Sequence, residues 1–489
     1  MTDEHPLRPA DVVRRTIVGA VSLGGGQVFS QVLNIAGLIV LARIMTPAEF
    51  GLVAIFTFFL ALLTALGDLG LGMSLVRQQN EPSETDFRAV SAFQKVLALG
   101  ITLAALAATP WAVRTYDLEP GQWWLFPVMA LAIVADAIRF YPLAKFERRL
   151  RYEYVGAVEI TQAVVFNIVL LMLAVAGYKT ICFPVAVVFR SSAGAMLANV
   201  MGPRVPAWFW DWPTVRRYLA TGLPYQGVHL IAVLRNSIVP VFIALLLGRA
   251  AVGHLEWAAM VAGFPLTGLI LLQRLYVGSF SRLLAHPDEL RRFVTHLVTV
   301  AHAIVAPLAV LTLVLIDPIV RIVFGEVWLT AVPIVRWLWL GCLVIPTTAP
   351  LTGLLHAVGK SRVAFLAALG GSLATWAVGV PLVFAFGEVG VAVGMLSVHV
   401  AGYVVWRTAR RAVDFRVLGP AAFAWVCALP AAGVAWWWQA TFPIASVVQL
   451  LLCGAVAGAV YVLALGLAGM TFLRPVRDAL ALGGLGRPA

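Results

Sequence analysis

The stretch LARIMTPAEFGLVAIFTFFLALLTALGDLGLGMSLVRQ, residues 41–78, decides the class of this protein. Between Phe50 and Val76 it carries a single charged residue, Asp68. About 20 apolar residues are enough for a helix to cross a hydrocarbon core roughly 30 Å thick. A carboxylate in such a helix lies either near the membrane edge or at a costly depth. Which of the two applies to Asp68 depends on the rest of the chain.

Composition indicates that the whole chain is a membrane protein. Of its 489 residues, 61% are hydrophobic and 12% are charged, and the mean hydropathy is +0.92. Soluble domains average roughly 45–50% apolar and about 25% charged residues. The four cysteines fall inside apolar segments without a CxxC pair, so they indicate neither a disulfide nor a metal site. The net charge of +12 reports orientation in the membrane, and we expect no nucleic-acid partner.

Glycines, prolines and charge clusters divide the chain into fourteen apolar segments. Their approximate limits are 17–42, 50–76, 89–110, 122–141, 155–176, 181–201, 218–247, 252–277, 294–316, 328–355, 363–384, 388–406, 418–438 and 443–468. Each is long enough to cross a bilayer as a helix. The sequence therefore predicts an all-α polytopic membrane protein with about fourteen transmembrane helices.

The basic residues predict the orientation of these helices. If the N-terminus is cytoplasmic, most of the 35 lysines and arginines fall in cytoplasmic segments, and the outer loops hold few. Those in the outer loops are Arg43, Arg114, Lys179, Arg249 and Arg321. Cytoplasmic loops of membrane proteins carry an excess of Lys and Arg. We therefore expect both termini to be cytoplasmic.

The loops between the segments are short, so we expect no water-facing catalytic domain. The sequence contains no DxD pair, Walker loop, GxSxG or HExxH motif. We predict that the protein is not an enzyme and that it has no catalytic residue, metal site or cofactor. If it acts on a substrate, it does so inside the helix bundle.

An internal repeat predicts the division of the chain. The stretches LARIMTPAEFGLVAI (41–55) and LLGRAAVGHLEWA (246–258) both place a polar turn and a glycine before a span. Two unrelated hairpins would also explain this similarity. We expect a six-helix lobe over 1–201, a cytoplasmic linker over 202–217, a second six-helix lobe over 218–406, and two further helices and a tail over 407–489. Pseudo-symmetric lobes around a central cavity are a common plan of transporters.

The opening stretch, 41–78, also closely resembles the start of Wzx-like polysaccharide flippases. These belong to the multidrug/oligosaccharidyl-lipid/polysaccharide exporter superfamily. VGHLEWAAMVAGFP, FSRLLAHPDELRRF, IDPIVRIVFGEVWLTAVPIVRWL and LTGLLHAVGKSRVAF resemble the second half of the family in the same order. The resemblance covers about residues 12 to 410. It departs where relatives often carry Asn-Leu-Asp-like residues, since this chain has Arg235-Asn236-Ser237, and a role resting on that acid is not carried over.

The resemblance implies a flippase of the bacterial inner membrane. Its substrate would be an oligosaccharide linked to undecaprenyl diphosphate, moved from the cytoplasmic to the periplasmic leaflet for O-antigen, capsule or exopolysaccharide synthesis. Membrane lipids would surround it, and a polysaccharide polymerase and a chain-length regulator are further candidate partners. Such work requires a polar path and positive charge for the diphosphate, because burial of an anionic headgroup is costly.

Two arginines lie at the right depth to bind the diphosphate. Arg190 is about ten residues into its segment and Arg235 about a dozen into the apolar part of its own, so both fall near the centre of a ~30 Å core. A central arginine costs roughly 2.5–3.5 kcal/mol on insertion scales, and its planar fork suits phosphate oxygens. Pairing with an acid or with helix-end carbonyls is the structural alternative.

Amide-rich stripes on two spans are candidates for contact with sugar hydroxyls. The first span carries Gln27, Ser30, Gln31 and Asn34 at three- and four-residue spacing, and the seventh carries Gln226, His229 and Asn236. Residues at this spacing share one helix face, and amides both donate and accept hydrogen bonds. Hydrogen bonding between helices would use the same residue types.

Four charged residues fall at matching depth in the cytoplasmic half of the first lobe. They are Asp68, Lys95, Asp136 and Glu159. We predict an inner gate, with Asp68 and Lys95 as a pair, or an acid that titrates and couples transport to an ion. Structural pairing of all four is the alternative.

Two other functions remain open from the sequence. A multidrug or cation antiporter of the same superfamily would use an acid near the membrane centre, where this chain has arginines. A membrane-embedded polysaccharide polymerase or ligase would need a large outer catalytic loop, and the outer loops are short.

Overall fold

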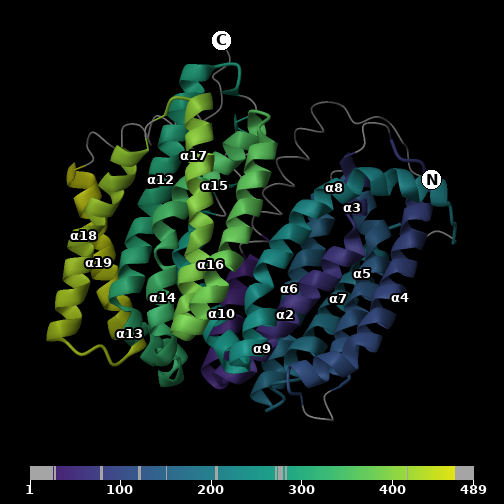
Figure 1. Ribbon diagram of the computed structural model, residues 1–489, viewed down its shortest axis with the longest axis horizontal. Coiled ribbons are helices and arrows are strands. Elements are labelled where there is room, and N and C mark those ends of the chain that lie inside the picture. The colour runs from purple at the N-terminus through teal and green to yellow at the C-terminus, as the bar shows by residue number, and fades with distance from the viewer. Residues whose placement is uncertain are drawn as a thin grey trace. The chain divides into compact units, whose positions relative to one another are not determined.

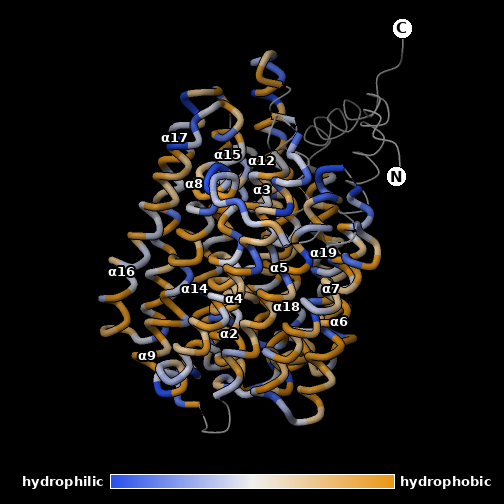
Figure 2. Tube along the Cα trace, turned by 90° about the vertical axis from the view of Figure 1, so that its right-hand side faces the viewer, coloured by the Kyte–Doolittle hydropathy of each residue, from blue (hydrophilic) through white to orange (hydrophobic). Residues whose placement is uncertain are grey.

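The computed structural model describes residues 26, 29–77, 81–118, 123–149, 151–203, 208–269, 272–273, 279–280, 283–415 and 417–468. All regular elements within these ranges are helices, which confirms the all-α prediction. The chain divides into two compact units, residues 1–253 and 254–489. Figure 2 shows hydrophobic residues along the length of the helices, as lipid contact requires.

The first unit consists of long helices, of which α4 to α7 lie side by side (Figure 1). Its helices are Phe29–Ile44, α2 (Pro47–Asp68), α3 (Leu71–Arg77), α4 (Glu84–Thr115), α5 (Leu125–Arg148), α6 (Tyr152–Val175), α7 (Cys182–Met201), α8 (Trp212–Asn236), a π-helical stretch (Ile238–Ile243), α9 (Ala244–Leu247) and the start of α10 (Arg249–Gly263). Two starts are fixed by capping boxes, Thr46 with Glu49 at α2 and Ser83 with Asp86 at α4.

The second unit contains α12 to α19, several of them interrupted. Its elements are the 3-10 turn Phe264–Gly268, α12 (Pro287–Val314), α13 (Ile316–Ile319), the π-helical Val320–Phe324, the 3-10 helix Glu326–Ala331, α14 (Val332–Leu338), α15 (Gly341–Ala357), α16 (Ser361–Leu396), the 3-10 turn Ser397–His399, α17 (Val400–Ala412), α18 (Leu418–Thr441) and α19 (Val447–Ala468). The two C-terminal helices pack on α12 (Figure 1).

The described residues contain 10 helices long and apolar enough to cross a membrane, or 11 if one bent pair counts as a span. The predicted count of fourteen is therefore not confirmed. One cause is that segments 17–42 and 252–277 lie partly outside the described residues. Another is that segment 328–355 is broken into two helices bent by 50°. A third is that segments 363–384 and 388–406 form one apolar stretch of 52 residues.

That long stretch is a helical hairpin that turns at Gly387, where φ is 56°. Small residues on its two arms face each other. A Cβ on Gly390 would lie 2.0 Å from the Leu382 oxygen, and one on Gly394 would lie 2.3 Å from Gly379 Cα. The paired positions move apart equally from the turn, as they do in antiparallel helices. Two separate spans, as the sequence predicts, therefore remain the correct description of this stretch.

The stretch 41–78 also contains a helix break, directly after Asp68. Leu69 and Gly70 have φ of 47° and 74°, which ends α2 before α3 begins. A helix end leaves its last four carbonyls without partners, and in a membrane each must be satisfied by protein. Gln94 Nε2 on α4 donates to the Asp68 carbonyl at 3.2 Å, and Gln226 Nε2 on α8 donates to the Ala65 carbonyl at 2.7 Å.

Glycines at this break allow α8 to cross α2 in backbone contact. A Cβ added to Gly222 would lie 2.7 Å from the Gly70 oxygen, and one added to Gly70 would lie 2.2 Å from the Gly222 oxygen. Small residues let membrane helices approach closely. Asp68 is therefore the last residue of a helix at a crossing and not a residue in mid-span.

Contacts within each unit agree with the predicted alternation of loops. In the first unit the outer residues Glu49 and Lys179 pair at 3.2 Å, and the inner residues Asp86 and Arg217 pair at 2.8 Å. In the second unit the inner segments that carry Arg291 and Asp414 lie 3.7 Å apart at these side chains. Which of the two sides is cytoplasmic still rests on the positive charges.

The polar turns of the internal repeat, Pro47–Gly51 and Arg249–Gly253, contact each other through equivalent residues. A Cβ on Gly51 would lie 1.9 Å from the Arg249 oxygen, and a Cβ on Gly253 would lie 1.9 Å from the Pro47 oxygen. Gly51 and Gly253 occupy the same position of the repeat, as do Pro47 and Arg249. Equivalent residues that contact each other in this exchanged way are the signature of a local two-fold relation. This favours a true repeat over two unrelated hairpins.

The crossing predicts opposite effects for two glycines of α8. Gly222→Ala places its methyl against the Gly70 carbonyl, and we expect it to lower the free energy of unfolding by about 1–3 kcal/mol. Gly227→Ala is the control, because no atom lies within 4 Å of its Cβ, and it adds up to about 1 kcal/mol of helix propensity. Thermal unfolding of the purified variants in one detergent measures both. Equal stability of Gly222→Ala and wild type would contradict the crossing.

Candidate functional site

Three helices of the first unit, α5, α6 and α7, bring polar side chains together. Arg139 Nη1 on α5 donates to Gln162 Oε1 on α6 at 3.1 Å. Gln162 is buried against Gly194 on α7, where a Cβ would lie 2.3 Å from Gln162 Nε2. The glycine thus leaves room for the amide that holds Arg139.

A second group of polar side chains lies one helical turn from Arg139 on α5 and from Gly194 on α7. Asp136 Oδ1 is 3.0 Å from Arg139 Nη2 on the same helix. Arg190, four residues before Gly194 on α7, places its guanidinium carbon 5.9 Å from the centre of the Phe166 ring. The charges of Asp136 and Arg139 both act on Arg190. The structure therefore brings two predicted residues, Asp136 and Arg190, to one site from different helices.

Arg190 itself is exposed and unpaired. Within the part of the chain that the structure describes, no side chain or carbonyl forms a hydrogen bond or ion pair with it. A guanidinium has five N–H donors, and an unpaired one inside a membrane-spanning helix is a functional candidate. Its ring contact with Phe166 does not satisfy those donors.

Arg139 belongs to this site and lies deeper in α5 than the sequence predicts. The predicted segment 122–141 put it at the inner edge, and it counted as a basic residue of the cytoplasmic side. The helix α5 continues to Arg148, so Arg139 lies nine residues before its end. A stretch rich in charged residues, KFERR, hid this extension, because hydropathy falls before the helix ends.

Two of the three predicted acids of the inner half act on an acid that no sequence pattern singles out. Asp68, Glu159 and Arg139 all act electrostatically on Glu147, near the end of α5. Glu159 lies three residues before Gln162 on α6, so it shares that helix face. These residues form a charged cluster toward the end of α5, and Asp136 is connected to it only through its pair with Arg139.

Lys95 does not join the cluster as predicted. The pair Asp68–Lys95 is not formed, since Lys95 has no acidic partner among the described residues. Its neighbour Gln94 reaches Asp68 instead, through the backbone carbonyl. The prediction of this pair was wrong because adjacent residues of a helix point about 100° apart, and depth alone does not fix direction.

The glycan-facing candidates divide between exposed and helix-bonded side chains. Gln31 is exposed, whereas Asn34 Oδ1 accepts a hydrogen bond of 2.9 Å from Asn167 Nδ2 on α6. Gln226 binds the α2 backbone, as described above. Asn236 is exposed at the end of α8. For these residues both roles, helix contact and sugar contact, remain compatible with the geometry.

Three predicted positions fall outside what the structure describes. Gln27 belongs to the residues left undescribed, and the side chains of His229 and Arg235 do as well, although their backbone belongs to α8. The proposal that Arg235 binds the diphosphate from the second repeat stays a prediction.

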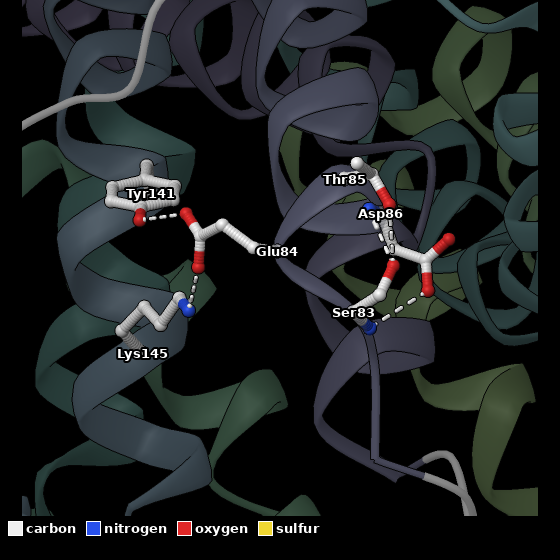
Figure 3. Close-up of polar contacts among 6 residues, drawn as sticks. All are labelled: Ser83, Glu84, Thr85, Asp86, Tyr141 and Lys145. Carbon is white, nitrogen blue, oxygen red and sulfur yellow. Dashed lines mark hydrogen bonds and ion pairs between the residues drawn. The ribbon is translucent and has the colours of Figure 1, made fainter.

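A charged network on the predicted inner side ties α4 to α5 (Figure 3). Glu84 accepts hydrogen bonds of 2.5 Å from both Tyr141 Oη and Lys145 Nζ. The same lysine lies 4.3 Å from the centre of the Phe87 ring. Beside it, Asp86 caps α4 through the Ser83 amide at 2.9 Å. These contacts hold α4 against α5, so the basic residues at this end of α5 also stabilise the packing of the two helices.

In the second unit, one histidine connects three outer segments. His254 Nδ1 on α10 lies 2.9 Å from Glu388 Oε2, and its Nε2 lies 3.3 Å from Thr330 Oγ1. The neighbouring Trp257 stacks on Trp328 with ring centres 5.1 Å apart. The sequence places these segments on one side but gives no sign that they meet.

Comparison with known proteins agrees with this geometry. The family model "Polysaccharide biosynthesis protein" matches residues 40–333. The lipopolysaccharide biosynthesis protein WzxC of Escherichia coli (strain K12) is 23% identical over 367 residues, which cover 72% of each chain.

Two solved structures share the fold. A lipid II flippase MurJ in an inward closed conformation has a TM-score of 0.75 at 12% identity, over 93% of this chain and all of that one. An inward-facing multidrug resistance MATE transporter of the MOP superfamily has a TM-score of 0.64 at 13% identity, over 79% of this chain and 94% of that one.

The family model covers more than half of the chain, and the two solved structures are a flippase and a transporter. The apolar helices make the chain a multi-pass membrane protein. This chain therefore belongs to the polysaccharide biosynthesis protein family.

Proposed function

We propose that the protein moves oligosaccharides linked to undecaprenyl diphosphate from the cytoplasmic to the periplasmic leaflet of the inner membrane. The prenyl tail stays in lipid while the headgroup crosses. The protein then has to lower the cost of burying a polar, anionic group, and no covalent bond changes. Alternating access between the lobes 1–201 and 218–406, joined by the linker 202–217, is the mechanism that the repeat favours.

The observation that carries this proposal is the guanidinium of Arg190, which has no hydrogen-bond or ion-pair partner among the described residues. It lies eight residues from the start of α7, a helix of 20 residues, and thus about 12 Å from that end. An arginine binds phosphate oxygens through two parallel hydrogen bonds. A cationic drug would be repelled at this position, which favours an anionic lipid headgroup over the drug of a multidrug antiporter.

The amides of the first unit are proposed to serve the glycan. Gln31 and Asn34 lie on one face of the helix Phe29–Ile44. Asn236 and Gln226 lie on α8, and Gln27 and His229 extend the two stripes. The acids Asp68, Asp136 and Glu159, with Lys95, remain the candidates for an inner gate or for ion coupling. A polymerase and a chain-length regulator would receive the delivered units, and both termini would be cytoplasmic.

The first test removes the guanidinium. Arg190→Gln should abolish surface polysaccharide, because the diphosphate loses its charge-assisted bonds, worth roughly 1.5–3 kcal/mol each. Arg336→Gln is the control, since Arg336 is an exposed arginine paired with Asp317 at 3.2 Å. Membrane insertion is checked by immunoblot, and polysaccharide is measured on gels. Normal polysaccharide in the Arg190 variant would overturn the role of this arginine.

The second test separates sugar contact from helix contact at Asn34. If the bond to Asn167 is its whole role, the variants Asn34→Ala and Asn167→Ala should destabilise the protein non-additively, by about 0.6 kcal/mol of coupling. Transport would then fall equally in both. If Asn34 also contacts sugar, Asn34→Ala should reduce transport well below Asn167→Ala at equal stability. Thermal unfolding and flipping in proteoliposomes provide the two measurements.

A further inference from the structure

The helix α17 packs one face on protein and leaves the opposite face exposed. Val405 and Ala409 are buried in a core cluster together with residues of α12, α15 and α16. On the opposite face Val400 and Val404 are 72% and 47% exposed. The helix ends an apolar stretch, Ser361–Ala412, that is long enough to cross the membrane. Exposed apolar side chains of such a helix lie against lipid, so this is a lipid-facing surface.

The lipid-facing surface of α17 becomes basic toward the predicted inner end of the helix. The two valines are followed at helical spacing by Arg407 and Arg411, which lie within about 60° of them around the helix axis. Arg410 lies beside these two, with its guanidinium carbon 5.4 Å from the centre of the Trp406 ring. A change from apolar to aromatic and basic side chains marks the level of the lipid headgroups.

These three arginines lack acidic partners in the part of the chain that the structure describes. Arg407, Arg410 and Arg411 are exposed there and form no ion pair or hydrogen bond. The next acid along the chain, Asp414, pairs with Arg291 on α12 at 3.7 Å. The positive charge of the surface is therefore not neutralised by the protein itself.

The neighbouring helix adds further positive charge at this place. The start of α16 contacts α17, since Ala364 shares the core cluster with it. This start carries Arg362 and directly follows Lys360. Arginines in the last turn of a helix also complement the helix dipole. Arg407, however, lies five residues before the end of α17, beyond the reach of that effect.

We propose that the inner end of α17 binds an anionic phospholipid of the cytoplasmic leaflet. Arg407, Arg410 and Arg411 hold the headgroup phosphate through charge-assisted hydrogen bonds, and the acyl chains lie along Val400 and Val404. A zwitterionic phospholipid fits less well, because its cationic group is repelled by the same guanidiniums. The bound lipid is a resident ligand and not the cargo, so this inference goes beyond the proposed function and does not depend on it.

The test uses the full-length protein in detergent, titrated with phosphatidylglycerol or with phosphatidylcholine of the same acyl chains. Native mass spectrometry counts the bound lipids and measures their affinities. We expect the wild type to prefer phosphatidylglycerol. The triple variant Arg407→Gln, Arg410→Gln, Arg411→Gln should lose about a hundredfold in affinity for it, since each basic residue at a membrane surface contributes about fivefold. Affinity for phosphatidylcholine should stay unchanged.

A matched control comes from the first unit. Arg151 is another arginine of the predicted inner side that lies on an aromatic ring, 4.5 Å from the centre of Tyr154, but it pairs with Glu153 at 3.4 Å. Arg151→Gln should therefore bind phosphatidylglycerol as the wild type does. Thermal unfolding checks the fold, because the triple variant should keep the wild-type Tm without lipid. Added phosphatidylglycerol should raise the Tm of the wild type and not that of the triple variant.

Two results would overturn the phospholipid surface. One is an unchanged preference for phosphatidylglycerol in the triple variant. The other is displacement of the arginine-dependent phosphatidylglycerol by farnesyl diphosphate at a lower concentration, because the surface would then serve the cargo. Failure of this inference leaves the flippase proposal intact, since that proposal is tested through surface polysaccharide.

Discussion

The rest of the first unit depends on one constraint, the need to satisfy backbone carbonyls where α2 ends inside the membrane. Lipid supplies no hydrogen-bond donor, so every carbonyl freed at the break after Asp68 must be served by protein. Gln94 and Gln226 serve two of them from α4 and α8. Their reach requires α8 to approach α2 closely, and Gly70 and Gly222 permit this. One broken helix thus fixes the positions of two others.

The same principle explains the charged residues deeper in the unit. A guanidinium in a membrane helix is retained only where a partner or a ligand compensates for its cost. Arg139 has such partners in Asp136 and Gln162, whereas Arg190 has an aromatic ring and a more distant carboxylate. The two arginines thus differ in their partners, since Arg139 has two acceptors and Arg190 has none among the described residues.

Other polar contacts hold neighbouring helices together within each unit. Glu84, Tyr141 and Lys145 tie α4 to α5 on the inner side. In the second unit His302 accepts a bond of 3.0 Å from Trp425 Nε1, which fastens α18 to α12. Because an indole N–H only donates, His302 Nδ1 is the acceptor of this bond.

The sequence by itself determined the class, the family block at residues 41–78 and the alternation of inner and outer loops, because hydropathy and charge act residue by residue along the chain. It also selected Asp136 and Arg190, since a charge in an apolar run is visible without any structure. Only the tertiary structure decided the partners. Gln94 and not Lys95 reaches the Asp68 carbonyl, and Arg139 lies deeper in α5 than the inner edge of the predicted segment, because direction around a helix and the true end of α5 depend on packing against neighbouring helices. Depth can be read from a sequence, but which side chains meet is set by how the helices turn toward one another.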